Sequence, residues 1–289
     1  MKILITGANG QLGRSIHKIE NDFPEFKITY TDIEDLNILS EDQVASFISK
    51  VKPDFLINCA AYTSVDQAEK DGEKARKLNS YAPGLLAGVM HRNNAKTIHI
   101  STDYVFDGNK GGEYFEDDIP TARSMYGKSK AEGEKSVLKY PGTIVIRTSW
   151  LYSEFGKNFF KTMNNLLLEK KEIKVVNDQT GTPTYATDLA KTLLRMVQFS
   201  KKGKLSDGIY HYSNEGIASW YEFAGEISKK INSSCTIHPV TTKEFPLPAP
   251  RPSYSVMNKD KIKRLGISLP DWKESLGLCL KAYQKTILN

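Results

Sequence analysis

The stretch Gly7-Ala8-Asn9-Gly10-Gln11-Leu12-Gly13 decides the fold, because it joins a short apolar run to a segment with helical spacing. The apolar run, Ile3 to Ile5, is typical of a buried strand. Glycines at positions 7, 10 and 13 permit a tight turn, a close approach of the backbone to a pyrophosphate, and close packing of helix on strand. The helix then offers free N–H groups and the positive end of its dipole to the phosphates. The alternative is a strand-to-helix turn that is glycine-rich by chance. Because the turn directly follows the first strand, a role in binding a dinucleotide is favoured.

Short β-branched runs alternate with helical stretches through the first half of the chain. The candidate strands are Ile3 to Ile5, Lys27 to Tyr30, Phe55 to Asn58, Thr97 to Ile100 and Ile144 to Arg147. Strands this apolar, separated by helices, indicate a parallel sheet that is covered on both faces. Right-handed crossovers then give an α/β fold with a doubly wound parallel sheet, of the Rossmann kind.

The pattern changes after Trp150. We expect a helix over 158–171, a strand at 173–176, a turn at 177–183, a helix over 188–199 and a strand at 209–212. Residues 1–150 and 174–213 are expected to form the dinucleotide-binding Rossmann domain. Residues 151–173 and 214–289 are expected to form a smaller α/β substrate-binding lobe over the carboxyl edge of the sheet.

The composition excludes several classes of protein. Of the 289 residues, 39% are hydrophobic and 26% are charged, and no stretch approaches the ~20 unbroken apolar residues of a membrane span. The first ten residues do not form a secretory signal, because glycines interrupt their short apolar run. The net charge of +6 comes from lysines interspersed with acids, which is typical of solvated helix faces. We therefore expect no membrane and no nucleic-acid partner, while a mildly basic surface favours a diphosphate-bearing ligand.

The cysteines and histidines show no metal-ligand spacing. Cys59, Cys235 and Cys279 lie far apart, and an odd count without a framework suits a reducing compartment. We therefore expect a cytoplasmic protein. No two of the five histidines are spaced as a ligand pair, so no dedicated metal site is predicted.

Asp32 closes the second predicted strand. An acid there can accept hydrogen bonds from the adenine-ribose hydroxyls, and it favours NAD over NADP because it would repel a 2′-phosphate. No Lys or Arg between Thr31 and Asn37 offsets that repulsion. Capping of the next turn is the alternative role for Asp32. The third strand ends in small residues up to Thr63, where a cofactor could lie against the backbone.

An ordered series of Thr, Tyr and Lys predicts a ketone reductase. Thr102 ends the fourth strand, and Tyr126 and Lys130 follow at i and i+4, so that one helix face carries both. A free phenol titrates near ~10, and a cationic Lys130 would stabilise the phenolate and lower that pKa. Tyr126 could then give a proton to a ketone oxygen that Thr102 holds by a hydrogen bond. A packed Tyr beside a surface Lys is the alternative, since the spacing alone is near chance.

These features resemble the extended short-chain dehydrogenase/reductase superfamily. The glycine turn, Asn79, the Ser101-Thr102 strand end and the Tyr-x-x-x-Lys helix match in order. More specific blocks resemble the dTDP-4-dehydrorhamnose reductase family over essentially the whole chain: 60–66, 101–108, 147–152, 177–184, 248–252 and 269–272. The resemblance implies NADPH- or NADH-dependent reduction of the C4 ketone of dTDP-4-dehydro-β-L-rhamnose to dTDP-β-L-rhamnose, the last step of dTDP-L-rhamnose biosynthesis.

The resemblance also implies a role for individual residues. Catalysis would fall to Thr102, Tyr126 and Lys130, while Asn79 would help to hold the active-site helix and a relay water. The dTDP-sugar would contact Val65, Thr102, Asp103, Tyr126, Trp150 and Arg251, and Arg251 would pair with the diphosphate. The cofactor would contact Gly7, Gly10, Gln11, Leu12, Gly13, Asp32, Asn37, Ile38, Ala60, Ala61, Thr63, Tyr126 and Lys130.

Two departures from the family limit what the resemblance implies. Asn37-Ile38 stands where the family often has an Asp-hydrophobe pair near the adenine. Arg14 and Ser15 occupy a turn in which some members pair acidic residues around magnesium at a dimer interface, so neither that metal nor that dimer is predicted. A monomer and a homodimer both stay open, as does the choice between NADH and NADPH.

Three other functions share parts of this pattern. A nucleotide-sugar dehydratase typically has Asp-Glu after the strand-end Thr, whereas this chain has Asp103-Tyr104. An epimerase must retain its NAD through the reaction. A non-catalytic, dinucleotide-binding regulatory subunit resembling that of methionine adenosyltransferase would bind the cofactor without turning over a sugar ketone. The intact set of Thr102, Tyr126 and Lys130 argues against this last alternative.

Overall fold

A six-stranded parallel sheet forms the centre of the molecule in the computed structural model, which describes residues 1–288. The strand order is β10-β5-β4-β3-β1-β2, and every neighbouring pair is parallel. The predicted doubly wound α/β sheet is therefore confirmed. The chain reverses its direction of winding between β1 and β3, where ligands bind in such sheets. The strands are β1 (Lys2–Thr6), β2 (Lys27–Thr31), β3 (Phe55–Asn58), β4 (Lys96–Thr102), β5 (Thr143–Thr148) and β10 (Gly208–Tyr212).

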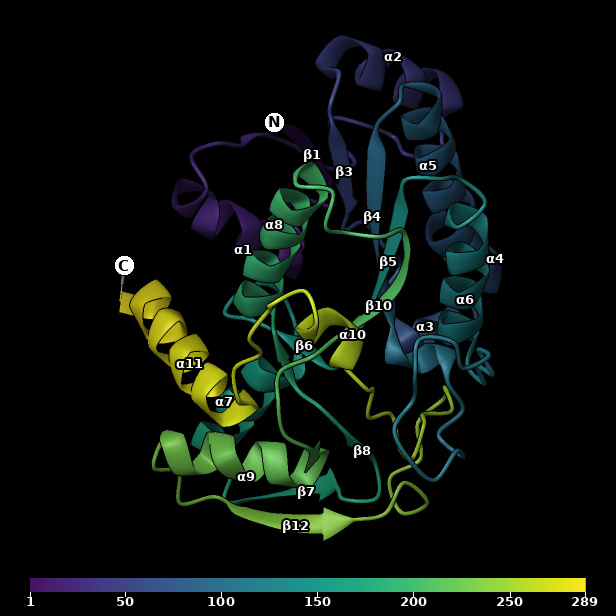
Figure 1. The fold of residues 1–289 in the computed structure, drawn as a ribbon. Coiled ribbons are helices and arrows are strands. Elements are labelled where there is room, and N and C mark those ends of the chain that lie inside the picture. The colour runs from purple at the N-terminus through teal and green to yellow at the C-terminus, as the bar shows by residue number, and fades with distance from the viewer. Residues whose placement is uncertain (289) are drawn as a thin grey trace.

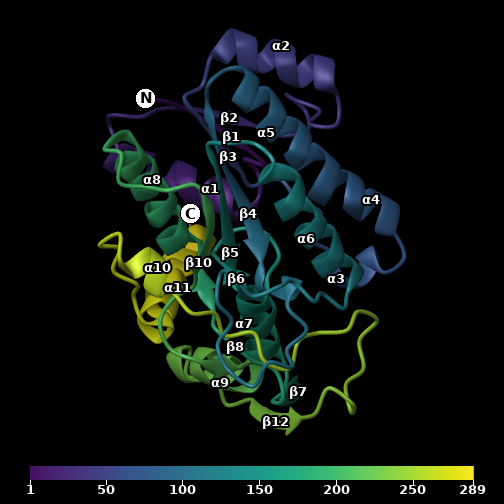
Figure 2. The same ribbon diagram turned by 45° about the vertical axis from the view of Figure 1, so that its right-hand side comes forward.

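Helices cover both faces of this sheet (Figures 1 and 2). The helices α1 (Gln11–Ile19) and α8 (Ala186–Lys201) lie on one face, while α2 (Glu41–Val51), α5 (Ala82–Arg92) and α6 (Met125–Val137) lie on the other. Short helical elements join these layers: η1 (Glu20–Asp22), α3 (Val65–Ala68), α4 (Gly72–Arg76), η2 (Lys77–Tyr81) and η3 (Asp103–Val105).

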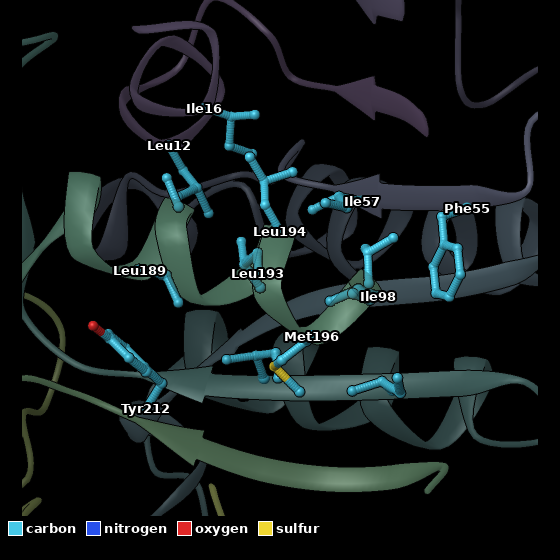
Figure 3. Packing of buried hydrophobic residues seen from close by; sticks show 14 of the residues in the cluster. Leu12, Ile16, Phe55, Ile57, Ile98, Leu189, Leu193, Leu194, Met196 and Tyr212 are labelled. Atoms are coloured by element: carbon cyan, nitrogen blue, oxygen red, sulfur yellow. The ribbon is translucent and has the colours of Figure 1, made fainter. Parts of the chain in front are cut away.

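The first strand shows why the sequence builds two layers. Ile3 and Ile5 belong to the cluster that contains Leu12 and Ile16 of α1, and Figure 3 shows these α1 side chains meeting leucines of α8. Leu4, between them, belongs to the opposite cluster, with Val44 of α2 and Leu86 of α5. Alternate side chains of a strand point to opposite faces, so an unbroken apolar run is buried from both sides.

A second cluster of buried side chains lies beyond the carboxyl edge of the sheet. It gathers Tyr152, Phe160, Phe223 and Trp272, and Figure 1 shows its helices and its two-stranded ribbon grouped on that side. The helices are α7 (Phe159–Glu169), α9 (Trp220–Lys230) and α11 (Trp272–Leu288). The short helix α10 (Asp260–Lys263) instead packs beside β10, and its Ile262 belongs to the first cluster. The short strands are β6 (Leu151–Tyr152), β7 (Glu172–Val176), β8 (Thr180–Gly181), β9 (Thr184–Tyr185), β11 (Ala218–Ser219) and β12 (Thr236–Val240).

One predicted boundary is wrong. Residues 174–176 were expected in the Rossmann domain, but β7 pairs in parallel with β12 and has no partner in the central sheet. Val175 is its one fully buried side chain, and it packs in the second cluster with Phe160. The alternation of exposed and buried positions in β7 suits a ribbon covered on one face only. The other boundaries of the two-part division stay predictions.

None of the helices formed by the described residues combines the length and the hydropathy required to cross a lipid bilayer.

Candidate active site

A cavity of about 820 Å³ opens at the carboxyl edge of the central sheet. Its floor comes from the ends of β1, β3 and β4 and from α6, and its far wall from the segment after β5 together with α9. The lining residues include Gly7, Gly10, Gln11, Leu12, Asp32, Ile38, Ala60, Ala61, Thr63, Val65, Thr102, Asp103, Tyr126, Lys130 and Trp150. Three predicted site residues, Gly13, Asn37 and Arg251, lie outside the lining.

The glycine turn fits a bound pyrophosphate. Gly7 has φ +68°, and a Cβ atom there would lie 2.6 Å from the amide nitrogen of Ala60, so only glycine fits between β1 and the chain after β3. The N–H groups of Gln11 and Leu12 at the start of α1 have no acceptor among residues 1–288. Free N–H groups at a helix N-terminus bind anions. The residues present therefore fit a dinucleotide cofactor.

Asp32 is tied to the glycine turn. Its Oδ2 accepts a hydrogen bond of 2.8 Å from the backbone N–H of Asn9, and its Oδ1 accepts from the N–H of Ile33. Ile33 is 61% exposed at the mouth of the cavity. Asn37 turns away from the cavity, because its amide oxygen accepts from the N–H of Leu39 and its own N–H donates to Gln43.

Tyr126 and Lys130 lie on one face of α6, beside Thr102 at the end of β4. The pKa of the Tyr126 phenol is raised and not lowered as expected: burial raises it to about 12, the Thr102 side chain opposes this rise, and Asp103 adds to it. Burial lowers the pKa of the Lys130 ammonium to about 8, against Glu134 and Cys59, which raise it. The helix begins at a Ser124 cap, whose hydroxyl accepts from the N–H of Gly127.

A chain of buried polar side chains extends from Lys130 under the sheet edge. The Lys130 Nζ donates to the carbonyl oxygen of Ile100 at 2.5 Å and lies 3.4 Å from Nε2 of His99. The other ring nitrogen of His99 lies 3.1 Å from the side-chain nitrogen of Asn58. The amide oxygen of Asn58 accepts from the Thr6 hydroxyl at 2.7 Å. Sequence reasoning gave no role to His99 or Asn58.

Asp103 is a buried carboxyl group beside Thr102. The Thr102 hydroxyl donates to its Oδ1 at 3.1 Å, while its Oδ2 has no hydrogen-bond donor among the described residues. Burial raises the pKa of the Asp103 carboxyl to about 6, against the side chains of Ser255 and Thr102, which lower it. Its unsatisfied oxygen makes Asp103 a polar group available to a ligand.

Asn79 joins α6 to the chain that follows β3. Its side-chain nitrogen donates to the Ser129 hydroxyl at 3.0 Å and to the carbonyl oxygen of Tyr62, and its side-chain oxygen accepts from the N–H of Tyr62. It lies in the π-helical turn Lys77–Tyr81. The side chain is therefore fully engaged in holding the helix that carries Tyr126.

Trp150 forms an aromatic wall of the cavity together with two residues that sequence reasoning missed. Its ring stacks on that of Trp220 with centroids 3.6 Å apart and planes within 5°, and Phe159 packs against Trp220 at 4.4 Å. Trp150 holds a left-handed backbone conformation, with φ +48°. The segments lie some seventy residues apart in the sequence, so no local pattern signals the pairing.

Arg251 forms an ion pair with Asp66. Its NH1 and NH2 atoms donate to the two carboxylate oxygens at 3.0 and 2.8 Å, and NH1 also donates to the carbonyl oxygen of Ala249. The Arg251 side chain lowers the pKa of the Asp66 carboxyl by hydrogen bonding. The pair fastens the Pro-rich stretch 248–252 to α3 at the edge of the cavity.

The first turn of α1 carries Arg14 and Ser15, and its surroundings are basic and aromatic. The guanidinium of Arg14 lies 4.3 Å from the centre of the Phe155 ring. Lys18 pairs with the buried Glu154 at 2.5 Å. Across residues 1–288, no three His, Cys, Asp or Glu side chains are grouped so that they could hold a metal ion.

The sheet, the glycine turn and the Tyr126–Lys130 helix define a class of protein, the dinucleotide-binding α/β fold of the short-chain dehydrogenase/reductase type. Residues 1–285 match the family described as the RmlD substrate binding domain. A dTDP-4-dehydrorhamnose reductase of Aggregatibacter actinomycetemcomitans is 41% identical over 284 residues, which cover 95% of this chain and 97% of the relative. The chain belongs to the dTDP-4-dehydrorhamnose reductase family.

Solved structures agree with that membership. A crystal structure of a dTDP-4-dehydrorhamnose reductase from Clostridium acetobutylicum is similar with a TM-score of 0.93 and 42% identity, covering 98% of this chain and 100% of the other. The corresponding protein from Bacillus anthracis, solved in complex with NADP, is similar with a TM-score of 0.92 and 38% identity, covering 97% and 99%.

Proposed function

We propose that this protein reduces the C4 ketone of dTDP-4-dehydro-β-L-rhamnose to dTDP-β-L-rhamnose, with NADPH or NADH as reductant, as the last step of dTDP-L-rhamnose biosynthesis. One observation carries the proposal: Thr102, Tyr126 and Lys130 line the same cavity as the glycine turn and Trp150. A reducing cofactor and a sugar ketone could therefore meet at the phenol. The similarity to dTDP-4-dehydrorhamnose reductases over the whole chain supports the same substrate.

The proposed chemistry divides between cofactor and protein. The reduced nicotinamide, when bound, supplies a hydride to the ketone carbon. Tyr126 gives its phenolic proton to the ketone oxygen. The Thr102 hydroxyl, which donates to Asp103 in the structure, would turn its hydrogen to that oxygen and hold it. The cationic Lys130 stabilises the phenolate that remains on Tyr126. The high pKa of Tyr126 means that the phenol carries its proton at neutral pH.

The other predicted contacts are assigned by their place around the cavity. We propose that Gly7, Gly10, Gln11 and Leu12 bind the pyrophosphate, and that Gly13 lets α1 pack close to it. Asp32 and Ile38, with Asn37 behind them, would lie near the adenosine, and Ala60, Ala61 and Thr63 would lie along the cofactor. Val65, Asp103 and Trp150 would contact the sugar nucleotide.

Arg251 is proposed as the contact for the diphosphate. Its bonds to Asp66 and Ala249 occupy both hydrogens of NH1 and one of NH2, which leaves donors on NH2 and Nε. Asp66 therefore holds the guanidinium at the rim without using all of its donors.

Two further assignments belong to this proposal. We place the protein in the cytoplasm because Cys59, Cys235 and Cys279 are all free thiols. We also propose that the molecule divides into a Rossmann domain, formed by residues 1–150 and by a second segment that ends at residue 213, and a substrate-binding lobe, formed by residues 151–173, by β7 and by residues 214–289.

Turnover of the named substrate tests the function. Purified protein is mixed with dTDP-4-dehydro-L-rhamnose and either NADPH or NADH, and the absorbance of the reduced nicotinamide is followed. Consumption of the reductant with formation of dTDP-L-rhamnose is expected. Binding of the cofactor without oxidation would instead support the regulatory-subunit alternative, against which the complete Thr102, Tyr126 and Lys130 set argues. The ratio of the two rates decides the preferred cofactor.

A further inference from the structure

The Lys130 ammonium lies in an unusual environment for a buried cation. The side chain is 2% exposed, and its Nζ donates to the carbonyl oxygen of Ile100 at 2.5 Å. Its other neighbour in hydrogen-bond range is Nε2 of His99, at 3.4 Å. No carboxylate among the described residues forms a salt bridge with it. The protonation state of His99 therefore matters to Lys130.

The hydrogen bonds of Asn58 fix which nitrogen of His99 carries a proton. A backbone N–H is only a donor, so the atom of Asn58 that accepts from the N–H of Ala60 at 3.1 Å must be the amide oxygen. The same oxygen accepts from the Thr6 hydroxyl at 2.7 Å. The amide nitrogen then faces Nδ1 of His99 at 3.1 Å, and Nδ1 must accept.

The ring is consequently neutral, with its proton on Nε2. Burial, followed by the nearby Lys130 cation, keeps the pKa of the His99 imidazole well below its usual range. The Nε2–H group therefore points at the Nζ atom of Lys130. An ammonium group has no lone pair with which to accept that hydrogen, whereas a neutral amine has one.

We propose that His99 is a positioning residue: held by Asn58 with its proton on Nε2, it favours the neutral amine of Lys130 over the ammonium and so sets the upper pH limit of Lys130's support for Tyr126. This inference rests on the reductase function proposed above. His99 does not line the cavity, so it acts through Lys130 and not on the substrate.

The other titratable groups around Lys130 do not have this effect. Glu134, one turn further along α6, is bound through both oxygens to Arg147 at 2.9 and 2.8 Å, so that the pair is neutral as a whole. Desolvation raises the pKa of the Cys59 thiol to about 12, so that it stays uncharged. Tyr126 carries its proton at neutral pH, and Asp103 lies beyond it. Among these groups, His99 alone points an N–H toward Nζ.

The pH dependence of kcat/KM provides the first test, because it reports ionisations of the free enzyme. With Lys130 titrating near pH 8, kcat/KM at pH 9 should be about one tenth of its value at pH 7. In His99→Gln, a side-chain carbonyl can turn toward the ammonium. If the pKa of Lys130 then rises by about one unit, the same ratio becomes about one half, a fivefold change.

A second variant reaches the same result without altering His99. In Asn58→Asp, the carboxylate still accepts from Thr6 and Ala60, and it would now accept the Nδ1 proton of His99. The Nε2 atom of His99 then accepts a hydrogen bond from Lys130. As a result, the pH at which kcat/KM falls on the alkaline side is again higher than in the wild type. His211→Gln is the matched control, because His211 is also fully buried but contacts Arg147 instead of Lys130. Its profile should follow the wild type. The proposal is overturned if kcat/KM falls at the same alkaline pH as in the wild type in both His99→Gln and Asn58→Asp.

Nitrogen-15 NMR of the histidine rings tests the tautomer without any turnover. The signals of His99, identified by their loss in His99→Gln, should show a neutral ring with the proton on Nε2 from about pH 5 to about pH 8, the range in which an unperturbed histidine changes its charge. A proton on Nδ1, or a cationic ring at pH 7, would overturn the inference. If the sugar ketone is not reduced at all, the proposed function fails while this measurement still decides the tautomer.

Discussion

Replacing Gly181 with alanine tests whether the ring of Trp150 is held in place by its surroundings. A Cβ atom at position 181 would lie 2.7 Å from Cε2 of Trp150 and 2.8 Å from Cζ2 and Nε1. Ordinary contacts begin near 3.4 Å, so the indole must move by about 0.7 Å. The ring already stacks on Trp220 at 3.6 Å, and its backbone has a left-handed φ of +48°. It therefore has little freedom to adjust.

Overpacking of this kind costs about 1–3 kcal/mol. If that cost falls on the aromatic wall of the cavity, kcat/KM for the sugar nucleotide should fall by about 5- to 150-fold. The dissociation constant of NADPH should stay within about twofold of the wild type, because the three atoms nearest to the added Cβ all belong to Trp150 and none to the glycine turn. Steady-state kinetics with each ligand varied in turn, together with fluorescence titration of NADPH, measures both quantities.

Gly225→Ala is the matched control. Position 225 lies within α9, and a Cβ atom there would meet nothing within 4 Å. Alanine in a helix interior is favoured over glycine by about 1 kcal/mol, so this variant should be at least as stable as the wild type and equally active. The reasoning about Trp150 is refuted if Gly181→Ala keeps kcat/KM for the sugar within twofold of the control.

Three further substitutions have distinct expected outcomes. Tyr126→Phe should lower kcat/KM by about 10²- to 10⁴-fold with little change in NADPH affinity; a near-normal kcat would rule out the phenol as proton donor. Glu134→Ala should lower the free energy of unfolding in urea by about 3–5 kcal/mol, because it leaves the buried guanidinium of Arg147 without a counter-charge; a loss below ~1 kcal/mol would contradict this. Asp32→Ala should raise the NADPH-to-NADH ratio of kcat/KM by about tenfold, and an unchanged ratio would show that this carboxylate does not repel a 2′-phosphate.

The parts of the fold that follow from local sequence could be predicted. The run from Ile3 to Ile5 is apolar at every position, as burial from both sides requires, and the glycine turn follows it directly. The strand β7 has a weaker pattern. Its five residues have the length and composition of a strand, but nothing local states that β12, some sixty residues later, is its partner.

The candidate site likewise has a part that local sequence predicts and a part that depends on contacts between distant segments. Tyr126 and Lys130 share a helix face by their spacing, and this could be read from the sequence. Trp220 reaches the cavity only because α9 packs under the segment after β5, and Asp66 meets Arg251 across 185 residues. His99 occupies a strand interior, where a histidine is ordinarily a packed core residue. Its role depends on the orientation of the Asn58 amide, which only the three-dimensional arrangement reveals.

Contacts at the C-terminal end of α6 and along its sides fix the position of the helix face that carries Tyr126 and Lys130. Glu134 lies four residues beyond Lys130, where Arg147 of β5 binds both of its oxygens and the Ser101 hydroxyl of β4 donates to one at 2.6 Å. Beside these contacts, the helix glycines lie against neighbouring backbone: a Cβ atom on Gly133 would be 2.0 Å from the carbonyl oxygen of Asn79. Replacing a buried ion pair by apolar side chains is often neutral for stability, so stability alone does not account for Glu134 and Arg147. The bidentate pair fixes α6 against β5, the neighbour of β4, which ends in Thr102. Tyr126, the proposed proton donor, is thereby held at a constant distance from Thr102, which orients the ketone.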